Sequence, residues 1–113
     1  MIVDGQAVEH LSVCALGQDQ RHTLFGTLDR CSTPFGHRLL RSWLMHPLYI
    51  TNEIKSRQAA VNSLAENFGT LAEISKTLKT LPDFERLCTR IHAGTLSIKS
   101  FVTVLNGFKT VLV

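Results

Sequence analysis

The chain has few charged residues and lacks the patterns of several protein classes. Only 19% of its 113 residues are charged, against roughly a quarter in typical globular proteins. Its cysteines, Cys14, Cys31 and Cys88, form no C-x-x-C pair, which argues against a disulfide framework or a zinc site and favours reduced, mostly buried thiols of an intracellular protein. No run of about eighteen apolar residues is present, so no membrane partner is expected. The N-terminus has no basic region before an apolar stretch, which excludes a signal peptide.

Motifs for catalysis are missing as well. There is no G-x-x-x-x-G-K-S/T phosphate loop and no H-E-x-x-H pair among the histidines. Cys31 and Cys88 fall on apolar helical stripes, so core packing is predicted for them instead of a nucleophilic role. The sequence therefore predicts no catalytic residue, no metal ligand and no cofactor-binding residue within the chain, and no enzymatic activity of its own.

The net charge of +3 permits contact with nucleic acid without arguing for it, because the basic residues are scattered and no two are adjacent. Arg38 and Arg41 lie three residues apart and share one face of an expected helix. One interpretation is contact with DNA phosphates. The other is a solvated face or salt bridges to neighbouring domains, which we favour because nothing basic or aromatic extends the patch.

The hydrophobic fraction of 44% indicates an ordered chain, and its length fits one modest domain. We predict a mainly α fold, an irregular bundle of about five to six helices with a short β-hairpin at the N-terminus. The hairpin would pair residues 1–3 with residues 11–14 around the turn signal Asp4-Gly5. The expected helices cover about residues 23–31, 33–46, 52–67, 70–81, 83–94 and 97–113.

Several residues set the expected helix ends. Thr33 followed by Pro34 is typical of a helix start. Gly69 is expected to end one helix, and Thr70 with Glu73 to open the next as a capping box. Gly36, near the start of its helix, suggests that another backbone packs closely there. Acidic residues at positions 83 and 85 suit the positive end of a helix dipole, and the arginine at 86 is expected to pair with one of them or with the glutamate at 53.

One stretch carries a specific pattern. After Leu28-Asp29 the chain reads Thr-x-x-Gly-x-Arg-x-Leu-x-x-Trp-Leu-x-x-Pro-Leu, from Thr33 to Leu48. This run resembles the signature of the core (lever) domain of the MutS family. The segments Ile54-x-x-Arg57 and Leu81-Pro-Asp-Phe-Glu-Arg-Leu87 resemble the parts that follow it in that family. The resemblance covers nearly the whole chain in order and is greatest to the eukaryotic mismatch-recognising subunit of the MutSα heterodimer.

The resemblance implies that residues 1–113 are a single segment of the MutS core domain (domain III), ending before the insertion of the DNA clamp. Such a segment would be a structural and allosteric coupling element of a mismatched-DNA-binding ATPase that acts in DNA mismatch repair. The full-length relatives imply a DNA-dependent ATPase that uses ATP and Mg and works in the nucleus. Its implied partners are other domains of the same protein, a second MutS-homologue subunit, and mismatched duplex DNA bound through domains outside this segment.

The family motif also implies which residues matter, and their roles are expected to be structural. They hold helix packing or domain contacts: Thr33, Gly36, Arg38, Trp43, Pro47, Arg57, Asp83, Glu85 and Arg86. Trp43 lies on an apolar stripe, which predicts a core position. The alternative function is a freestanding helical module that binds protein, or that binds nucleic acid through Arg38, Arg41, Lys76 and Lys79. Phosphate contact by Arg38 or Arg41 is a separate, weaker expectation.

Overall fold

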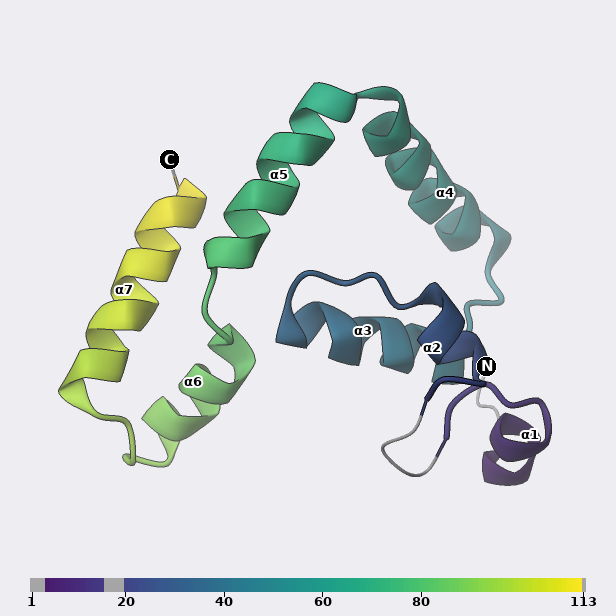
Figure 1. Cartoon of the computed structure of the whole chain (residues 1–113), viewed down its shortest axis with the longest axis horizontal. Coiled ribbons are helices and arrows are strands. Elements are labelled where there is room, and N and C mark those ends of the chain that lie inside the picture. Colours follow the sequence, from purple (N-terminus) through teal and green to yellow (C-terminus); the bar gives the residue numbers. More distant parts are fainter. Residues whose placement is uncertain (1–3, 16–19, 113) are drawn as a thin grey trace.

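The computed structural model describes residues 4–15 and 20–112, and the regular elements in this part of the chain are all helices. In Figure 1, α4 and α5 form an arch, α2 and α3 lie across its base, and α6 and α7 stand on the side opposite α1. The mainly α prediction is thus confirmed. The helices are α1 (Gly5–His10), α2 (Leu24–Leu28), α3 (Pro34–Met45), α4 (Thr51–Glu66), α5 (Phe68–Thr80), α6 (Phe84–His92) and α7 (Ile98–Leu112).

The predicted N-terminal hairpin is wrong where it can be checked. Its first half, residues 1–3, lies outside the described residues, while residues 5–10 form α1 and residues 11–14 form turns. The carbonyl oxygens of Ser12 and Val13 accept hydrogen bonds from the N–H groups of Leu24 and Phe25, at 2.8 and 3.0 Å. The first N–H groups of a helix have no partner within it. The second half of the expected hairpin therefore satisfies the start of α2 and does not form a strand.

Side-chain caps fix where several helices begin, as the sequence predicts. The hydroxyl of Thr33 accepts a hydrogen bond from the N–H of Gly36 at 3.1 Å, and Pro34 occupies the first turn of α3. The hydroxyl of Ser97 accepts one from the N–H of Ser100 at 3.2 Å at the start of α7. Gly94, with φ of +67°, follows α6 in the left-handed conformation that glycine adopts without steric cost.

The joint between α4 and α5 differs from its prediction. Asn67 alone separates the two helices, with φ −116° and ψ 73°. Gly69 lies in the first turn of α5 and does not end α4, and α5 begins without a side-chain cap, so the Thr70–Glu73 capping box does not form. One non-helical residue is enough to turn the chain, and Thr70 is already inside the helix.

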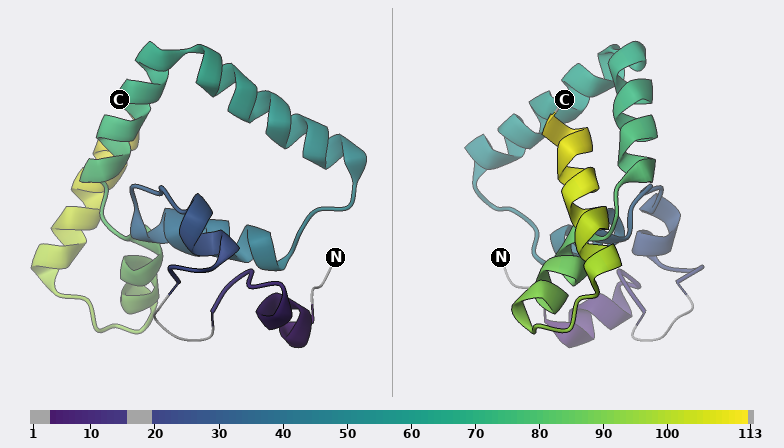
Figure 2. Two further views of the ribbon diagram at one scale, coloured as in Figure 1. Left: turned by 45° about the vertical axis from the view of Figure 1, so that its right-hand side comes forward. Right: turned by 90° about the vertical axis from the view of Figure 1, so that its left-hand side faces the viewer.

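The helices enclose an open frame and not a closed bundle. In the left view of Figure 2, α4, α5 and α3 border the opening, and α6 lies below the start of α3. The radius of gyration is 17.0 Å, whereas a compact chain of this length has about 13 Å. The accessible surface is 8915 Å², against about 6,200 Å² for a compact monomer of this mass. Many large apolar side chains are therefore exposed, among them Phe68 at 78% and Ile98 and Leu112 at 85% each.

α6 packs closely against α7. The rings of Phe84 and Phe108 are stacked with centroids 4.8 Å apart and an interplanar angle of 18°. Gly107 is buried beside them, and a Cβ atom at this position would lie 2.7 Å from Cζ of Phe84 and 2.9 Å from Cδ of Pro82. Val104, one turn earlier on α7, is 2% exposed. The absence of a side chain at Gly107 is what lets the start of α6 approach α7.

None of the helices in the described part of the chain combines the length and apolarity needed to cross a lipid bilayer.

Candidate functional site

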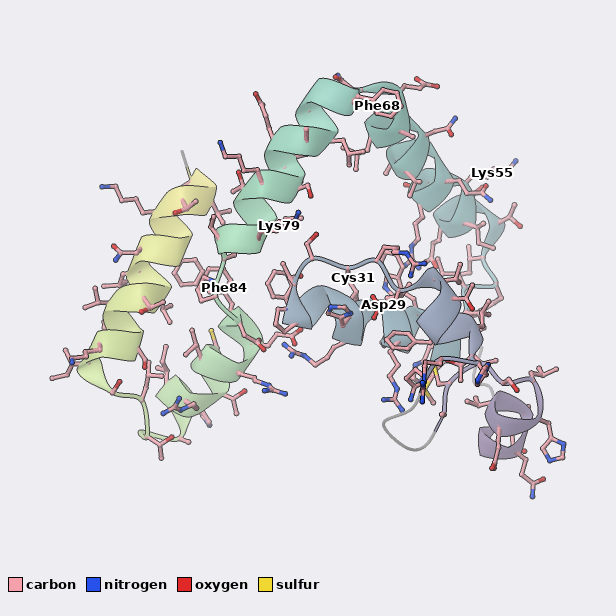
Figure 3. The ribbon with its side chains drawn as sticks, viewed as in Figure 1. Asp29, Cys31, Lys55, Phe68, Lys79 and Phe84 are labelled. Atoms are coloured by element: carbon pink, nitrogen blue, oxygen red, sulfur yellow. The ribbon has the colours of Figure 1, made fainter. Side chains whose placement is uncertain are left out.

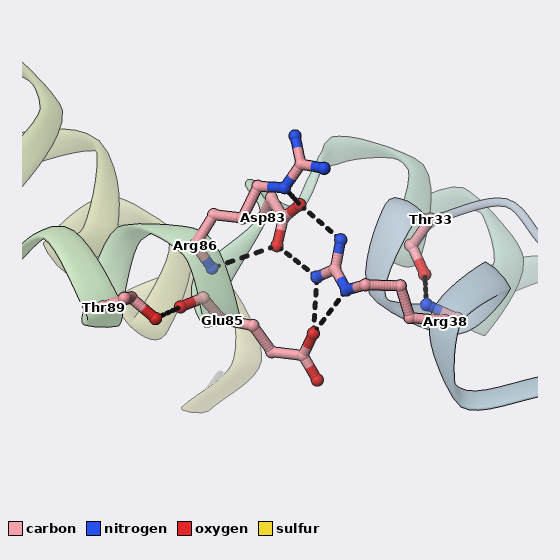
Figure 4. A network of polar contacts seen from close by, with 7 residues as sticks. Thr33, Arg38, Asp83, Glu85, Arg86 and Thr89 are labelled. Carbon is pink, nitrogen blue, oxygen red and sulfur yellow. Dashed lines mark hydrogen bonds and ion pairs between the residues drawn. The ribbon is translucent and has the colours of Figure 1, made fainter. Parts of the chain in front are cut away.

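Arg38 of α3 joins the start of α6 through two carboxylates. Its Nη1 and Nη2 donate to Oδ2 and Oδ1 of Asp83 at 2.9 and 2.6 Å, and its Nε donates to Oε2 of Glu85 at 2.7 Å. Arg86 adds a longer contact, with its Nε 3.6 Å from Oδ2 of Asp83. Figure 4 shows the two carboxylates converging on the one guanidinium. We call Arg38, Asp83, Glu85 and Arg86 the Arg38 cluster.

The Arg38 cluster is anchored at Asp83. The Asp83 side chain is 17% exposed, whereas that of Glu85 is 64% exposed, so solvent screens the second contact more strongly. Hydrogen bonds from Arg38 hold the pKa of the Asp83 carboxyl below its usual value and raise the pKa of Arg38 itself. Because Arg38 binds both oxygens of Asp83, the pair also fixes the orientation of the guanidinium relative to the carboxylate, which a single contact between point charges does not.

Local structure positions both partners. The Thr33 cap begins α3 one turn before Arg38. Asp83 is the N-cap of α6, where its Oδ1 accepts a hydrogen bond from the N–H of Arg86 at 3.3 Å. The same carboxylate therefore starts α6 and ties it to α3. Removing it would disturb both the helix end and the link between the helices.

Trp43 and Arg57 form a second contact, between α3 and α4. The guanidinium carbon of Arg57 lies 3.7 Å from the centroid of the Trp43 ring, a cation–π arrangement. The prediction that Trp43 lies in the core is wrong, because the residue is 40% exposed and the apolar stripe of α3 is only partly covered. The contact spans the loop that follows α3 and fixes the start of the arch.

The remaining motif residues take local roles. A Cβ atom at Gly36 would lie 2.8 Å from Oγ1 of Thr33, so the close neighbour is the helix cap and not another backbone, as the sequence had suggested. Pro47 follows the end of α3 and is half-buried. Arg41 is exposed. Phosphate contact by Arg38 or Arg41 stays a prediction, although the Arg38 guanidinium already has two carboxylate partners.

Sequence reasoning found the members of the Arg38 cluster but not their pairing. It expected Arg86 to pair with a nearby carboxylate or with Glu53, and the partner is Asp83. It did not join Arg38 to Asp83, which lies 45 residues further on. The signal that could have done so is the opposite charge of the two motif segments, since Thr33–Leu48 contains arginines and no carboxylate whereas Leu81–Leu87 contains two carboxylates.

Three side chains from the α2–α3 connection and the first turn of α3 also come together. Asp29, Cys31 and His37 each place one potential metal-binding atom within 4.8 Å of the other two. The sequence predicted no metal ligands, and it predicted Cys31 and Cys88 to lie on buried helical stripes. That prediction is wrong for both, because Cys31 is a half-buried loop residue and Cys88 is exposed.

Comparison of the sequence with known proteins identifies the family of the chain. The chain is 36% identical to the DNA mismatch repair protein MSH6 of Saccharomyces cerevisiae over 99% of its own length and 9% of that protein. It is 40% identical to Msh6 of Gallus gallus over 88% of the chain and 8% of that protein. It is 36% identical to the DNA mismatch repair protein MutS of Thermotoga maritima over 81% of the chain and 11% of that protein.

The chain thus spans about a tenth of the length of these relatives. No solved structure matches it significantly. The family model for MutS domain III matches residues 6–112, which includes the motif around Arg38 and the segment around Asp83. With this match over almost the whole chain, the chain belongs to the MutS domain III family.

Proposed function

We propose that this chain is a structural segment of a DNA mismatch repair protein and couples DNA binding to ATP use in other parts of that protein. The observation that carries the proposal is the Arg38 cluster, which links α3 to the start of α6. Membership of the MutS domain III family supports the repair role, because the relatives named above are DNA mismatch repair proteins.

The exposed surface supports embedding in a larger protein. The chain exposes 8915 Å², about 2,700 Å² more than a compact monomer of its mass. Exposed apolar areas beyond a few hundred Å² usually mark contact surfaces. Side chains such as Phe68, Ile98 and Leu112 would then contact other domains of the same protein.

Coupling requires two arrangements that the ligands distinguish. The frame offers a means, because α3 and α6 are bridged by an ion cluster whose partners can separate or re-form without disturbing a large core. A change transmitted through α6 would act on α3 through Arg38. In this proposal Arg38 and Asp83 are positioning residues, and the chain carries out no chemistry itself.

The wider setting is proposed from the family. ATP and Mg would bind in another domain, and mismatched duplex DNA would bind through domains outside this segment. The partner would be a second MutS-homologue subunit, and the compartment the nucleus, as in a eukaryotic relative. The segment would end before the clamp that grips DNA.

A chimaera tests the repair role. The region of S. cerevisiae MSH6 that matches this chain would be replaced by it, and mutation rate measured in a strain that lacks its own MSH6. The chimaera is expected to lower the mutation rate relative to that strain. Normal abundance of the chimaera with no lowering would contradict the proposed role.

The same chimaera tests the coupling. Arg38→Gln is expected to leave binding to mismatched duplex intact and to slow its release on addition of ATP at least several-fold. Arg41→Gln, an exposed arginine on the same helix, is the matched control and is expected to change neither. Equal release rates for the two variants would exclude the Arg38 cluster as the coupling element.

A further inference from the structure

Asp29 and Cys31 on the α2–α3 connection, together with His37 on the first turn of α3, gather one oxygen, one sulfur and one nitrogen donor. Figure 3 shows Asp29 and Cys31 close together on this connection. Oδ2 of Asp29 lies 2.5 Å from Nδ1 of His37, and the ligand atoms of Asp29, Cys31 and His37 all lie within 4.8 Å of one another. None of the three residues is a member of the Arg38 cluster, although His37 precedes Arg38 on α3.

The local backbone holds the three side chains in place. Asp29 directly follows α2, and its Oδ1 accepts a hydrogen bond from the N–H of Cys31 at 3.1 Å. The buried Thr33 then caps α3, which fixes the helical turn that carries His37. The Asp29 side chain is 15% exposed and that of His37 is 45% exposed, so the group is sheltered on one side and open on the other.

A purely structural role would leave these groups as a hydrogen-bonded turn. Burial alone raises the pKa of the Asp29 carboxyl, but hydrogen bonds from the Cys31 N–H, from His37 and from the Cys31 thiol outweigh it and lower that pKa. Burial, and then the hydrogen bond to Asp29, raise the pKa of the Cys31 thiol. The thiol therefore stays protonated, which argues against a nucleophilic cysteine. A doubly charged cation would instead lower the pKa of the Cys31 thiol, because a coordinated thiol loses its proton.

We propose that Asp29, Cys31 and His37 bind one divalent transition-metal ion, with Zn²⁺ the best fit. Carboxylate oxygen, imidazole nitrogen and thiolate sulfur are all ligands that Zn²⁺ accepts, whereas Mg²⁺ and Ca²⁺ prefer oxygen alone. Three protein ligands leave a fourth tetrahedral position on the exposed side, for water or an exogenous group. The charges of one Zn²⁺, one carboxylate and one thiolate cancel, which suits a half-buried site.

The required movement is small. Tetrahedral Zn²⁺ holds nitrogen and oxygen ligands at about 2.0–2.1 Å, which sets them roughly 3.3 Å apart. The Asp29 and His37 atoms would therefore separate by about 0.8 Å from their present 2.5 Å. Binding releases the thiol proton of Cys31, and the imidazole binds through Nδ1 with its proton on Nε2. The ion thus replaces the hydrogen bond between the two side chains.

Titration of the reduced 113-residue chain with Co²⁺ alone tests the site, because a cobalt–thiolate bond gives a charge-transfer band that nitrogen and oxygen ligands do not. One equivalent per chain is expected to saturate the band, and Zn²⁺ is expected to displace the Co²⁺. Cys31→Ser should abolish the band, and Asp29→Asn and His37→Ala should each weaken binding at least tenfold. Cys88→Ser is the matched control, an exposed thiol elsewhere, and should leave the titration unchanged.

The titration of the chain and its variants can either support or overturn the proposed metal site. Absence of the band, its survival in Cys31→Ser, or its loss in Cys88→Ser would overturn the proposal, the last because adventitious binding by a surface thiol would explain the signal. Circular dichroism of each variant guards against unfolding, and Asp29→Asn keeps the oxygen that accepts the Cys31 N–H. Saturation at one equivalent with the expected losses would support the site irrespective of the mismatch repair proposal.

Discussion

Replacing Gly107 by alanine is expected to destabilise the chain even though alanine favours helices. In the middle of α7 the substitution gains about 1 kcal/mol in helix propensity. Against this, the new Cβ would lie 2.7 Å from Cζ of Phe84 and 2.9 Å from Cδ of Pro82. Overpacking of a close contact costs about 1–3 kcal/mol. The clash therefore offsets the gain or exceeds it.

The neighbours decide how far the contact can relax. The Pro82 atom belongs to a ring attached to the backbone, so it cannot rotate away. The Phe84 ring is stacked on Phe108 and would have to give up that contact to move. We therefore expect a cost near the upper end of the range, and a net loss of about 1–2 kcal/mol in the free energy of unfolding.

Equilibrium urea unfolding followed by far-ultraviolet circular dichroism measures this loss. Gly69→Ala is the matched control, because a Cβ at this position of α5 meets no atom within 4 Å. It should leave stability unchanged or raise it by up to about 1 kcal/mol. If Gly107→Ala proved as stable as Gly69→Ala, the close approach of α6 to α7 at Gly107 would be refuted.

Three further substitutions give separate expectations. Trp43→Ala should cost about 2 kcal/mol in urea unfolding, below the 3–5 typical of a buried tryptophan, because the ring is 40% exposed; a cost in the full range would mean that the ring is covered. Asp83→Asn should lower the Tm at neutral pH. The pKa of Asp83 is depressed in the folded chain by Arg38, so its contribution is present above the ordinary value of 3.8 and is lost as the pH falls below it. Melts of parent and variant should therefore converge at acidic pH, and a constant difference would contradict the pairing. Gly26→Ala should be more damaging than Gly107→Ala, since its Cβ would lie 2.0 Å from the backbone oxygen of Gln20; a urea midpoint equal to that of the parent would refute this contact.

Local signals predicted helix ends well and long-range partners poorly. Thr33, Gly94 and Ser97 act within one turn of their own positions, so sequence alone identifies them as caps or stops. Pairing of Arg38 with Asp83 depends on how α4 and α5 return the chain, and that path depends on the joint at Asn67. The sequence shows which residues are charged, but it does not show that Arg38 and Asp83 lie close together in space.

Two misreadings have a common physical cause. Residues 11–14 look β-like, yet the carbonyl oxygens of Ser12 and Val13 accept hydrogen bonds from the first N–H groups of α2. Trp43 looks like a core residue, yet an apolar stripe does not say which element covers it, and Arg57 covers only one face of the ring. In both cases a neighbouring element decided the outcome, and propensity or periodicity does not describe that neighbour.

The single-residue joint at Asn67 would convert a small change in its backbone angles into a large displacement of α4. The 16 residues of α4 extend about 24 Å at the rise of an α-helix. A change of about 10° in the backbone angles of Asn67 would therefore sweep the far end of α4 through about 4 Å. No residue of α4 is buried, so little core packing opposes the movement, and the contact between Arg57 and Trp43 would have to shift with it. A torsion within the ordinary spread of one residue would thus displace the start of α4 by about 4 Å, and would displace Arg57, about 14 Å from the joint, by about 2 Å relative to its partner Trp43 on α3.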